Sequence, residues 1–129
     1  RDQSAEVARA LDYYNNGDYQ KALFEFSRLH SSLKHSAGVH CFLGNLYLLL
    51  NMIAKASQEY LMALKYDQRT PHAHLALSYI ALLQEDFYTA IDELSTALRL
   101  DRTFQANNSF LQQLIAAVEK RDNRSEWLV

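Results

Sequence analysis

The chain has few of the residues that interrupt helices or cross-link a fold: one proline, three glycines and one cysteine occur among its 129 residues. So few helix breakers favour a fold of nearly continuous helix. The lone Cys41 excludes an intramolecular disulfide, and a single unpaired cysteine is typical of proteins from reducing compartments. We therefore expect a helical protein, and we favour a cytoplasmic location.

An excess of charge of one sign is also missing, since 13 lysines and arginines face 15 aspartates and glutamates. The formal net charge of −2 provides no broad basic field for nucleic acid or an anionic membrane. No apolar run approaches the ~20 residues needed to span a bilayer. We expect a globular domain that neither binds nucleic acid nor inserts into membranes.

What the chain does have is an internal period of 34 residues. One phase of the period holds a small residue, and four positions later stands a large apolar residue. Further positions recur with the same step. The recurring sets are Ala22, Ala56 and Ala90; Phe26, Tyr60 and Leu94; Tyr19, Ile53 and Phe87; Ala63 and Ala97; Asp67 and Asp101. Such a period is typical of stacked helical hairpins, which usually work by presenting a surface.

The second repeat carries the most complete pattern, in which Leu43-Gly44-x-x-Tyr47 is followed by Ala56-x-x-x-Tyr60. This pattern resembles the tetratricopeptide repeat (TPR), and the resemblance covers about four fifths of the chain. The resemblance implies an all-α helical-hairpin solenoid, a TPR-like superhelix. Each repeat would consist of a first helix, a tight turn and a second helix. The repeats are expected at residues 3–36, 37–70 and 71–104.

The chain departs from the TPR pattern at both ends of each repeat. The family's tryptophan and proline are replaced, respectively, by Glu6, His40 and His74 and by Lys34, Gln68 and Arg102. Because His40 and His74 stand at a packing position, we expect satisfied packing histidines there. The pairs His72-x-His74 and His40-Cys41 point to different sides of a helix, so neither chelates a metal well. We expect no metal and no cofactor.

The expected turns and helix starts carry their usual residues. Asn15 to Asp18 and Glu85-Asp86 mark turns between paired helices, with Asp18 and Asp86 as N-caps. Thr70 places a capping hydroxyl before Pro71, which suits the first position of a helix.

The last part of the chain contains one more apolar helical stripe. Its members are Phe110, Leu111, Leu114, Ile115 and Val118. We expect a capping helix at about residues 105–121 that covers the last repeat. The domain would then span residues 1–123, and residues 124–129 would be a tail or the stump of a longer chain. Docking of Trp127 and its neighbours into another copy is the alternative.

In the TPR family the first helix of each repeat lines the inner, concave wall. The residues carried over to this wall are Val7, Leu11, Tyr14, Cys41, Phe42, Asn45, Leu48, Leu49, His72, Leu75, Tyr79, Leu82 and Leu83. The resulting wall is apolar and aromatic, with one amide, one imidazole and no lysine or arginine. We expect it to bind a hydrophobic or amphipathic peptide segment.

One known TPR ligand is excluded by this wall. The TPR subfamily that holds the C-terminal carboxylate of heat-shock chaperones uses lysine, asparagine and arginine at set concave positions. Those positions here are Val7, Leu11, Phe42, His72 and Ala76. A carboxylate needs charge-assisted donors, which these side chains do not offer.

These observations predict a non-catalytic protein-binding module, acting as an adaptor, scaffold or chaperone-like protein. Tyr14 and Tyr79 are hot-spot candidates, and Asn45 would bond a peptide backbone. The alternative is a self-association module that forms a homodimer, in the manner of the three-repeat type III secretion chaperones that this layout resembles. An enzyme ranks third, because a reactive Cys41 would need an orienting group and an oxyanion site.

Basic residues gather in the first repeat and again near the end of the chain. The two groups are Lys21, Arg28, Lys34 and His35, and Lys120, Arg121 and Arg124. Solvated helix faces explain both groups simply. An acidic partner is the alternative interpretation.

Overall fold

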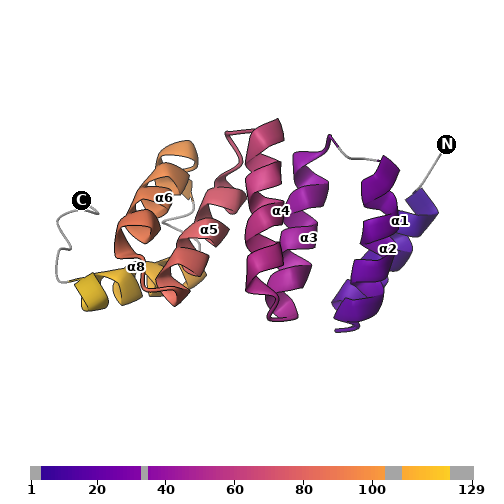
Figure 1. Cartoon of the computed structure of the whole chain (residues 1–129), viewed down its shortest axis with the longest axis horizontal. Coiled ribbons are helices and arrows are strands. Elements are labelled where there is room, and N and C mark those ends of the chain that lie inside the picture. The colour runs from indigo at the N-terminus through magenta and orange to yellow at the C-terminus, as the bar shows by residue number, and fades with distance from the viewer. Residues whose placement is uncertain (1–3, 33–34, 104–108, 123–129) are drawn as a thin grey trace. The chain divides into compact units, whose positions relative to one another are not determined.

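The structure is a computed structural model that describes residues 4–32, 35–103 and 109–122 (Figure 1). Every regular element within these ranges is a helix, which confirms the expected all-α class. The helices are α1 (Ser4–Asn15), α2 (Tyr19–Ser32), α3 (Ala37–Leu49), α4 (Ile53–Tyr66), α5 (Pro71–Leu83), α6 (Phe87–Leu100) and α8 (Ser109–Asp122). None of these described helices is long and apolar enough to cross a bilayer.

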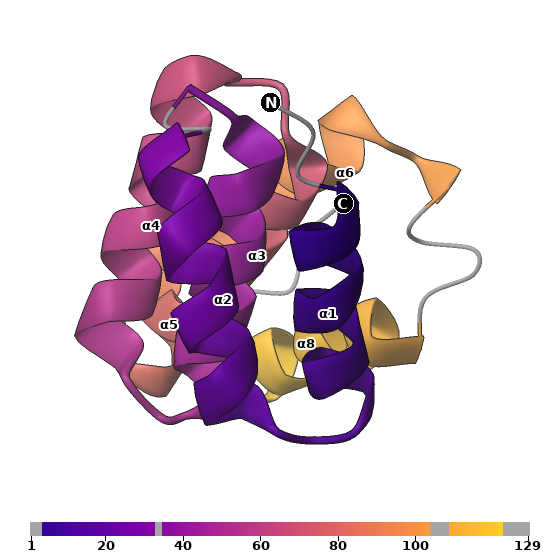
Figure 2. The same ribbon diagram turned by 90° about the vertical axis from the view of Figure 1, so that its right-hand side faces the viewer.

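Successive helices pair as hairpins: α1 packs on α2, α3 on α4, and α5 on α6. Figure 2 shows α1 and α2 side by side, joined by a short turn. The chain divides into two compact units, Arg1–Gln68 and Arg69–Val129. In the first unit α2 also packs on α3, so its two hairpins are stacked. A single working domain over residues 1–123 stays a prediction, and the expected tail at 124–129 lies outside the described residues.

The turns inside the three hairpins have one conformation, repeated at the period of the sequence. Gly17, Asn51 and Glu85 have positive φ angles of 81°, 60° and 59°. In each turn this residue donates its N–H to the carbonyl three positions back, at 2.9–3.1 Å. The next residue donates to the carbonyl five positions back, at 2.8–2.9 Å. This pair of bonds is the Schellman motif that ends a helix on a left-handed residue.

Small residues let the helices of each hairpin approach closely. Ala22, Ala56 and Ala90 are fully buried, at 0% exposure. The large residues four positions later, Phe26, Tyr60 and Leu94, are at most 5% exposed. A second small phase faces them, composed of Ala10, Gly44 and Ser78, all buried. The packing role expected for the alanines is confirmed.

Of the predicted side-chain N-caps at Asp86 and Thr70, the structure contains the first and not the second. Asp86 caps α6, since its carboxylate accepts the Thr89 N–H at 3.2 Å. Thr70 occupies the N-cap of α5 but makes no side-chain capping bond. The expected hydroxyl cap is therefore wrong, because the Ala73 N–H already bonds the Thr70 carbonyl at 3.2 Å. Pro71 is the first residue of α5, as expected.

The C-terminal helix α8 packs on α5 and α6 in the second unit. Ile115 is half-buried against the core that contains Leu75, Ile91 and Leu94. This contact is the one expected of a capping helix. The other side chains of the predicted apolar stripe, and residues 105–108 of the predicted helix, lie outside what the structure describes.

Candidate functional site

The predicted wall residues of the first unit lie on α1 and α3, the first helices of its two hairpins. All eight keep some exposure. Leu11 is 37% and Leu49 is 47% exposed, and Asn45 is also exposed. Val7, Tyr14, Cys41, Phe42 and Leu48 are half-buried. The most accessible of these side chains thus lie at positions 11, 45 and 49.

Aromatic contacts hold the half-buried part of this wall together. Phe42 stacks on Phe26 with ring centroids 4.3 Å apart, and its edge contacts Tyr14 at 5.1 Å. Tyr14 in turn contacts Tyr19 at 5.8 Å. These rings connect α1, α2 and α3, so Tyr14 and Phe42 stabilise the unit as well as lining its surface.

A hydrogen bond from the buried Tyr60 fixes the orientation of the Asn45 amide. The Tyr60 side chain is 1% exposed, and its hydroxyl donates a hydrogen bond to Asn45 Oδ1. Burial, together with the nearby Cys41 and Tyr14, raises the pKa of Tyr60, so the hydroxyl keeps its proton as a donor. Because Oδ1 is occupied, the exposed Asn45 amide offers its Nδ2 hydrogens to a ligand acceptor.

In the second unit the predicted wall residues lie on α5 and differ in exposure. His72 is exposed, Leu83 is 51% exposed, and Tyr79 and Leu82 are half-buried. Leu75 is only 5% exposed and belongs to the core with Leu94. Its prediction as a lining residue is therefore corrected: this side chain packs under the surface.

The exposures select a narrower surface than the predicted wall. In the first unit each first helix has two exposed positions four residues apart. We name these four residues the exposed stripe: Leu11 and Asn15 on α1, and Asn45 and Leu49 on α3. The equivalent residues of α5, in the second unit, are Tyr79, which is half-buried, and Leu83, which is exposed. Asn15 was missed by sequence reasoning, although the 34-residue step to Leu49 and Leu83 marks it.

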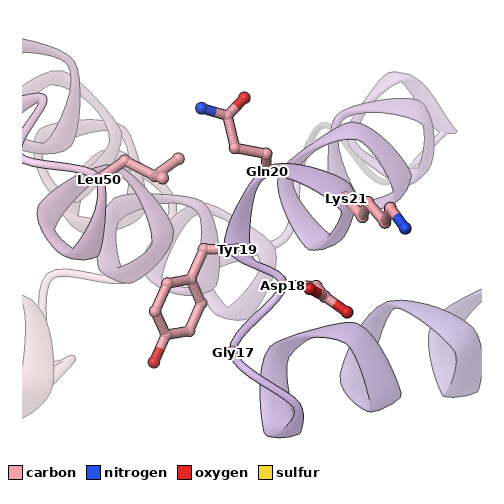
Figure 3. A pocket seen from close by; sticks show the side chains of 6 residues that line it. All are labelled: Gly17, Asp18, Tyr19, Gln20, Lys21 and Leu50. Carbon is pink, nitrogen blue, oxygen red and sulfur yellow. The ribbon is translucent and has the colours of Figure 1, made fainter.

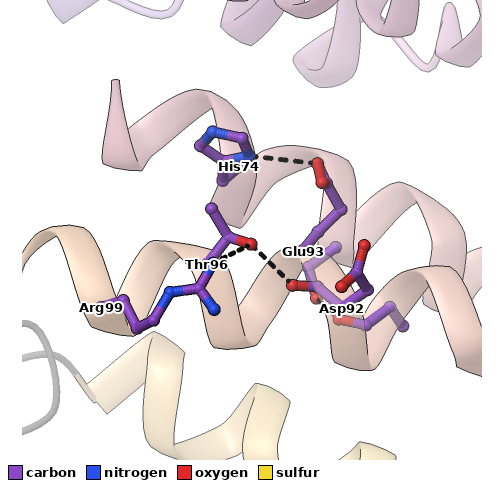
Figure 4. A network of polar contacts seen from close by, with 7 residues as sticks. His74, Asp92, Glu93, Thr96 and Arg99 are labelled. Atoms are coloured by element: carbon purple, nitrogen blue, oxygen red, sulfur yellow. Dashed lines mark hydrogen bonds and ion pairs between the residues drawn. The ribbon is translucent and has the colours of Figure 1, made fainter. Parts of the chain in front are cut away.

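Two histidine–glutamate pairs repeat with the period. His40 is 1% exposed, and its Nδ1 lies 2.8 Å from Glu59 Oε1. His74 Nδ1 lies 3.3 Å from Glu93 Oε2, as Figure 4 shows. The expected packing role of both histidines is confirmed. Among the described residues no three His, Cys, Asp or Glu side chains gather closely enough to hold a metal ion.

The Glu93 side of α6 carries a further polar chain beside this pair (Figure 4). Thr96 Oγ1 donates to the Asp92 carbonyl at 3.0 Å, and Arg99 Nη2 donates to Thr96 Oγ1 at 3.2 Å. These groups follow one exposed helix face and bond locally. They contribute to α6 and present no converging donors for a ligand.

The first repeat has no histidine–glutamate pair at the equivalent positions. Glu6 stands where the other repeats have histidine, and its buried Oε2 has no hydrogen-bond partner. Glu25, the counterpart of Glu59, is 8% exposed and lies 3.9 Å from both Arg9 and Arg28. Sequence reasoning missed this exchange of one histidine for two arginines, although the spacing of the glutamates carries the signal.

Cys41 lacks the setting of a catalytic nucleophile. Its side chain is half-buried, and burial raises the pKa of the thiol. The thiol therefore stays protonated at neutral pH, whereas attack requires the thiolate.

A shallow depression lies beside the first hairpin turn (Figure 3). Its volume is about 270 Å³, below the ~300–1,000 Å³ usual for small-molecule sites. The lining residues are Gly17, Asp18, Tyr19, Gln20, Lys21 and Leu50. In Figure 3 the Asp18 and Lys21 side chains extend outward from the ribbon and do not converge on one point.

No protein-family model matches the sequence, and no curated protein matches it. Solved structures do match, at low identity. The TPR domain of Arabidopsis OM64 is 16% identical with a TM-score of 0.81, covering 92% of this chain and 94% of that domain. The Yersinia enterocolitica type III secretion chaperone SycD, in complex with a peptide of the translocator YopD, is 17% identical with a TM-score of 0.79 over 90% and 91% of the two chains.

A third match is the second TPR domain of human RPAP3 in complex with an HSP70 peptide. It is 16% identical with a TM-score of 0.76, over 90% of this chain and 93% of that one. These neighbours are TPR domains and a secretion chaperone. The chain therefore has the fold of a TPR protein.

Proposed function

We propose that the chain is a non-catalytic peptide-binding module, an adaptor or chaperone-like protein, that holds an apolar or amphipathic segment on its exposed stripe. The observation that carries this proposal is the pairing of Leu49 with Asn45 on α3. Leu49 offers apolar area that is 47% exposed, and Asn45 presents amide donors oriented by the buried Tyr60. An extended peptide can use both contacts, one for a side chain and one for a backbone carbonyl, and an amphipathic helix can use the apolar contact.

The chemistry of the stripe selects the peptide class. None of its four residues is charged, so it offers no charged partner for an acidic chain end. Burying one leucine side chain contributes about 1.5–3 kcal/mol, and a few such contacts support micromolar binding after ordering costs. A structural neighbour in complex with a peptide of the translocator YopD supports this proposal.

The test uses three fluorescein-labelled peptides in fluorescence anisotropy. The first is an amphipathic peptide with leucines at helical spacing, the second has serine in place of each leucine, and the third ends in acidic residues and a free carboxylate. We expect micromolar binding of the first peptide alone. Tight binding of the acidic peptide, or equal binding of the serine peptide, contradicts the proposal.

Repeat-derived variants give matched controls. Leu49→Asn introduces the residue found one repeat earlier at Asn15, and we expect about tenfold weaker binding of the amphipathic peptide. Leu61→Ser removes a similarly exposed leucine on α4 and introduces the residue found at Ser27. We expect Leu61→Ser to bind like the wild type. An equal loss of peptide binding in both variants would indicate nonspecific binding to any exposed leucine and would contradict a site on the exposed stripe.

Self-association is the second candidate. It is favoured by the exposed leucines at Leu11, Leu49 and Leu83, and one SycD structure is described as an alternative dimer. A homodimer would cover the stripe with a second copy. Light scattering over a concentration series separates the two functions: a monomer at high concentration contradicts self-association. The single Cys41 leads us to propose a cytoplasmic location for either form.

A further inference from the structure

Phe24 breaks the repeat pattern on α2. Its side chain is 62% exposed, whereas the equivalent positions of the other repeats hold exposed polar residues, Gln58 and Asp92. This phase of the repeat is therefore a solvated helix face, and only the first repeat places an aromatic ring there. A single exposed ring is common on protein surfaces. The surroundings of Phe24 decide whether it forms part of a site.

Two cations flank the ring on the same helix face. The Arg28 guanidinium lies 5.6 Å from the centroid of the Phe24 ring, and the Arg28 side chain is 64% exposed. Lys21 Nζ lies 5.8 Å from the centroid of the Tyr13 ring. Spacings of three and four residues place Lys21, Phe24 and Arg28 on one side of α2. We call Tyr13, Lys21, Phe24 and Arg28 the Phe24 patch.

Comparison with the other repeats shows which contacts of the Phe24 patch recur and which occur in the first repeat alone. The lysine over tyrosine recurs one repeat later, where Lys55 Nζ lies 5.9 Å from the ring centroid of Tyr47. That pair therefore belongs to the repeat itself. Phe24 and Arg28 have no such counterpart, because the positions equivalent to Arg28 are Met62 and Thr96. The first repeat has gained an aromatic ring and a cation together.

The patch borders a hollow of about 360 Å³ between α1 and α2. Its lining residues are Tyr13, Gln20, Lys21, Phe24 and Glu25. Glu25 is the one acidic group of the lining, and it already faces Arg9 and Arg28 at 3.9 Å. The single carboxylate of the lining is therefore matched by two arginines, and Lys21 adds a further cation to the lining. The hollow thus has two aromatic rings, one amide, one lysine and one carboxylate that two arginines already face.

We propose that the Phe24 patch is a second docking surface, which binds an acidic peptide segment carrying one aromatic or large aliphatic anchor. The anchor lies in the hollow against Phe24 and Tyr13, and carboxylates beside it face Lys21 and Arg28. Charge complementarity selects this partner, since carboxylates gain from the two exposed cations. The exposed stripe is uncharged and selects a different peptide, so the two surfaces equip one chain to hold two unlike segments.

The probe is a fluorescein-labelled peptide with a tryptophan between acidic residues, measured by fluorescence anisotropy. We expect saturable binding that weakens as salt rises from low to physiological concentration, because the rim contacts are charged. A peptide with lysines in place of the acidic residues is expected not to bind, and neither is an oligothymidylate. Equal binding of the lysine peptide, or tighter binding of the oligothymidylate, overturns the proposal.

Substitutions taken from the other repeats test the patch within the architecture of the fold. Phe24→Gln introduces the residue of Gln58, and we expect about tenfold weaker binding. Arg28→Met introduces the residue of Met62, and we expect weaker binding with a smaller salt dependence. Phe24→Gln within twofold of the wild type overturns the proposal.

Two controls complete the experiment. Leu61→Ser, which removes an exposed leucine from α4, is expected to leave binding of the acidic probe unchanged. Leu49→Asn tests whether the two surfaces bind independently. We expect it to weaken binding of the amphipathic peptide and to leave binding of the acidic probe unchanged. Loss of the acidic probe in Leu49→Asn would place it on the exposed stripe and overturn a separate patch. Circular dichroism melts confirm that each variant is folded.

Discussion

The Tyr60 ring lies directly against the backbone of Gly44. A Cβ atom on Gly44 would stand 2.7 Å from both Cε1 and Cζ of Tyr60, closer than real Cβ contacts allow. The ring has no room to move away, since Tyr60 is 1% exposed and its hydroxyl is bonded to Asn45. Gly44 therefore sets the depth of the ring, and through it the orientation of the candidate ligand-binding amide.

We expect Gly44→Ala to destabilise the protein by about 1–3 kcal/mol, because the added methyl group overpacks a filled site. The matched control is Gly38→Ala on the same helix, where the new Cβ meets only Ser36 Oγ at 3.8 Å. That change is expected to be neutral or stabilising by up to ~1 kcal/mol, as alanine favours helix. Urea titrations of both variants measure the difference; equal stability contradicts the packing assignment.

Glu85 holds the left-handed turn conformation that Gly17 holds in the first repeat. A left-handed residue with a side chain costs roughly 1–2 kcal/mol, which glycine avoids at some cost in chain entropy. We expect Glu85→Gly to raise the free energy of unfolding by about 0.5–1 kcal/mol. The reverse test is Gly17→Ala: an added Cβ meets no atom within 4 Å, so the change tests backbone strain, and a lower melting temperature is expected.

Asp86 links the stability of α6 to pH. The hydrogen bonds from the Thr89 side chain and backbone hold the pKa of Asp86 below its ordinary value of 3.8. Because the pKa is lower in the folded state, the Asp86 carboxylate stabilises the protein above pH 3.8. This stabilisation is lost as the pH falls through the folded-state pKa and the carboxylate is protonated. We expect Asp86→Asn to lower the melting temperature at pH 7 and to flatten the acid limb of the pH profile. An unchanged acid limb would contradict the cap.

Cys41 should react slowly. Since burial raises the pKa of its thiol, less thiolate exists at neutral pH than in an exposed cysteine. We expect iodoacetamide to alkylate Cys41 more slowly than a short cysteine peptide at pH 7.5, and the rate to rise in urea. Mass spectrometry follows the modification. An alkylation rate above that of the cysteine peptide would contradict this prediction and favour Cys41 as a catalytic nucleophile.

The periodic residues were sufficient to predict the helical hairpins. Ala22, Ala56 and Ala90 recur because two helices can approach only where a side chain is small, and this requirement is local to each hairpin. The turn at Gly17 and the cap at Asp86 were predictable for the same reason. Each depends on residues that are neighbours in the sequence, so their chemistry is visible without coordinates.

The binding surface was only partly predictable. Val7, Cys41 and Leu75 share one phase of the repeat, yet the first two are half-buried and Leu75 is core. Helix α5 is apolar on nearly every side, so its pattern does not show which face neighbouring helices cover. Burial depends on which helices pack against a position, and that is settled by contacts between segments distant in the chain.

The sequence by itself determined the period, the helix class and the uncharged character of the first-helix wall, because these follow from residue type and spacing alone. Only the tertiary structure decided which wall residues reach solvent, how Tyr60 orients Asn45, and that Arg9 and Arg28 replace a histidine beside Glu25. These relationships join side chains on different helices. Their distances depend on how the helices pack, which spacing along the chain does not specify.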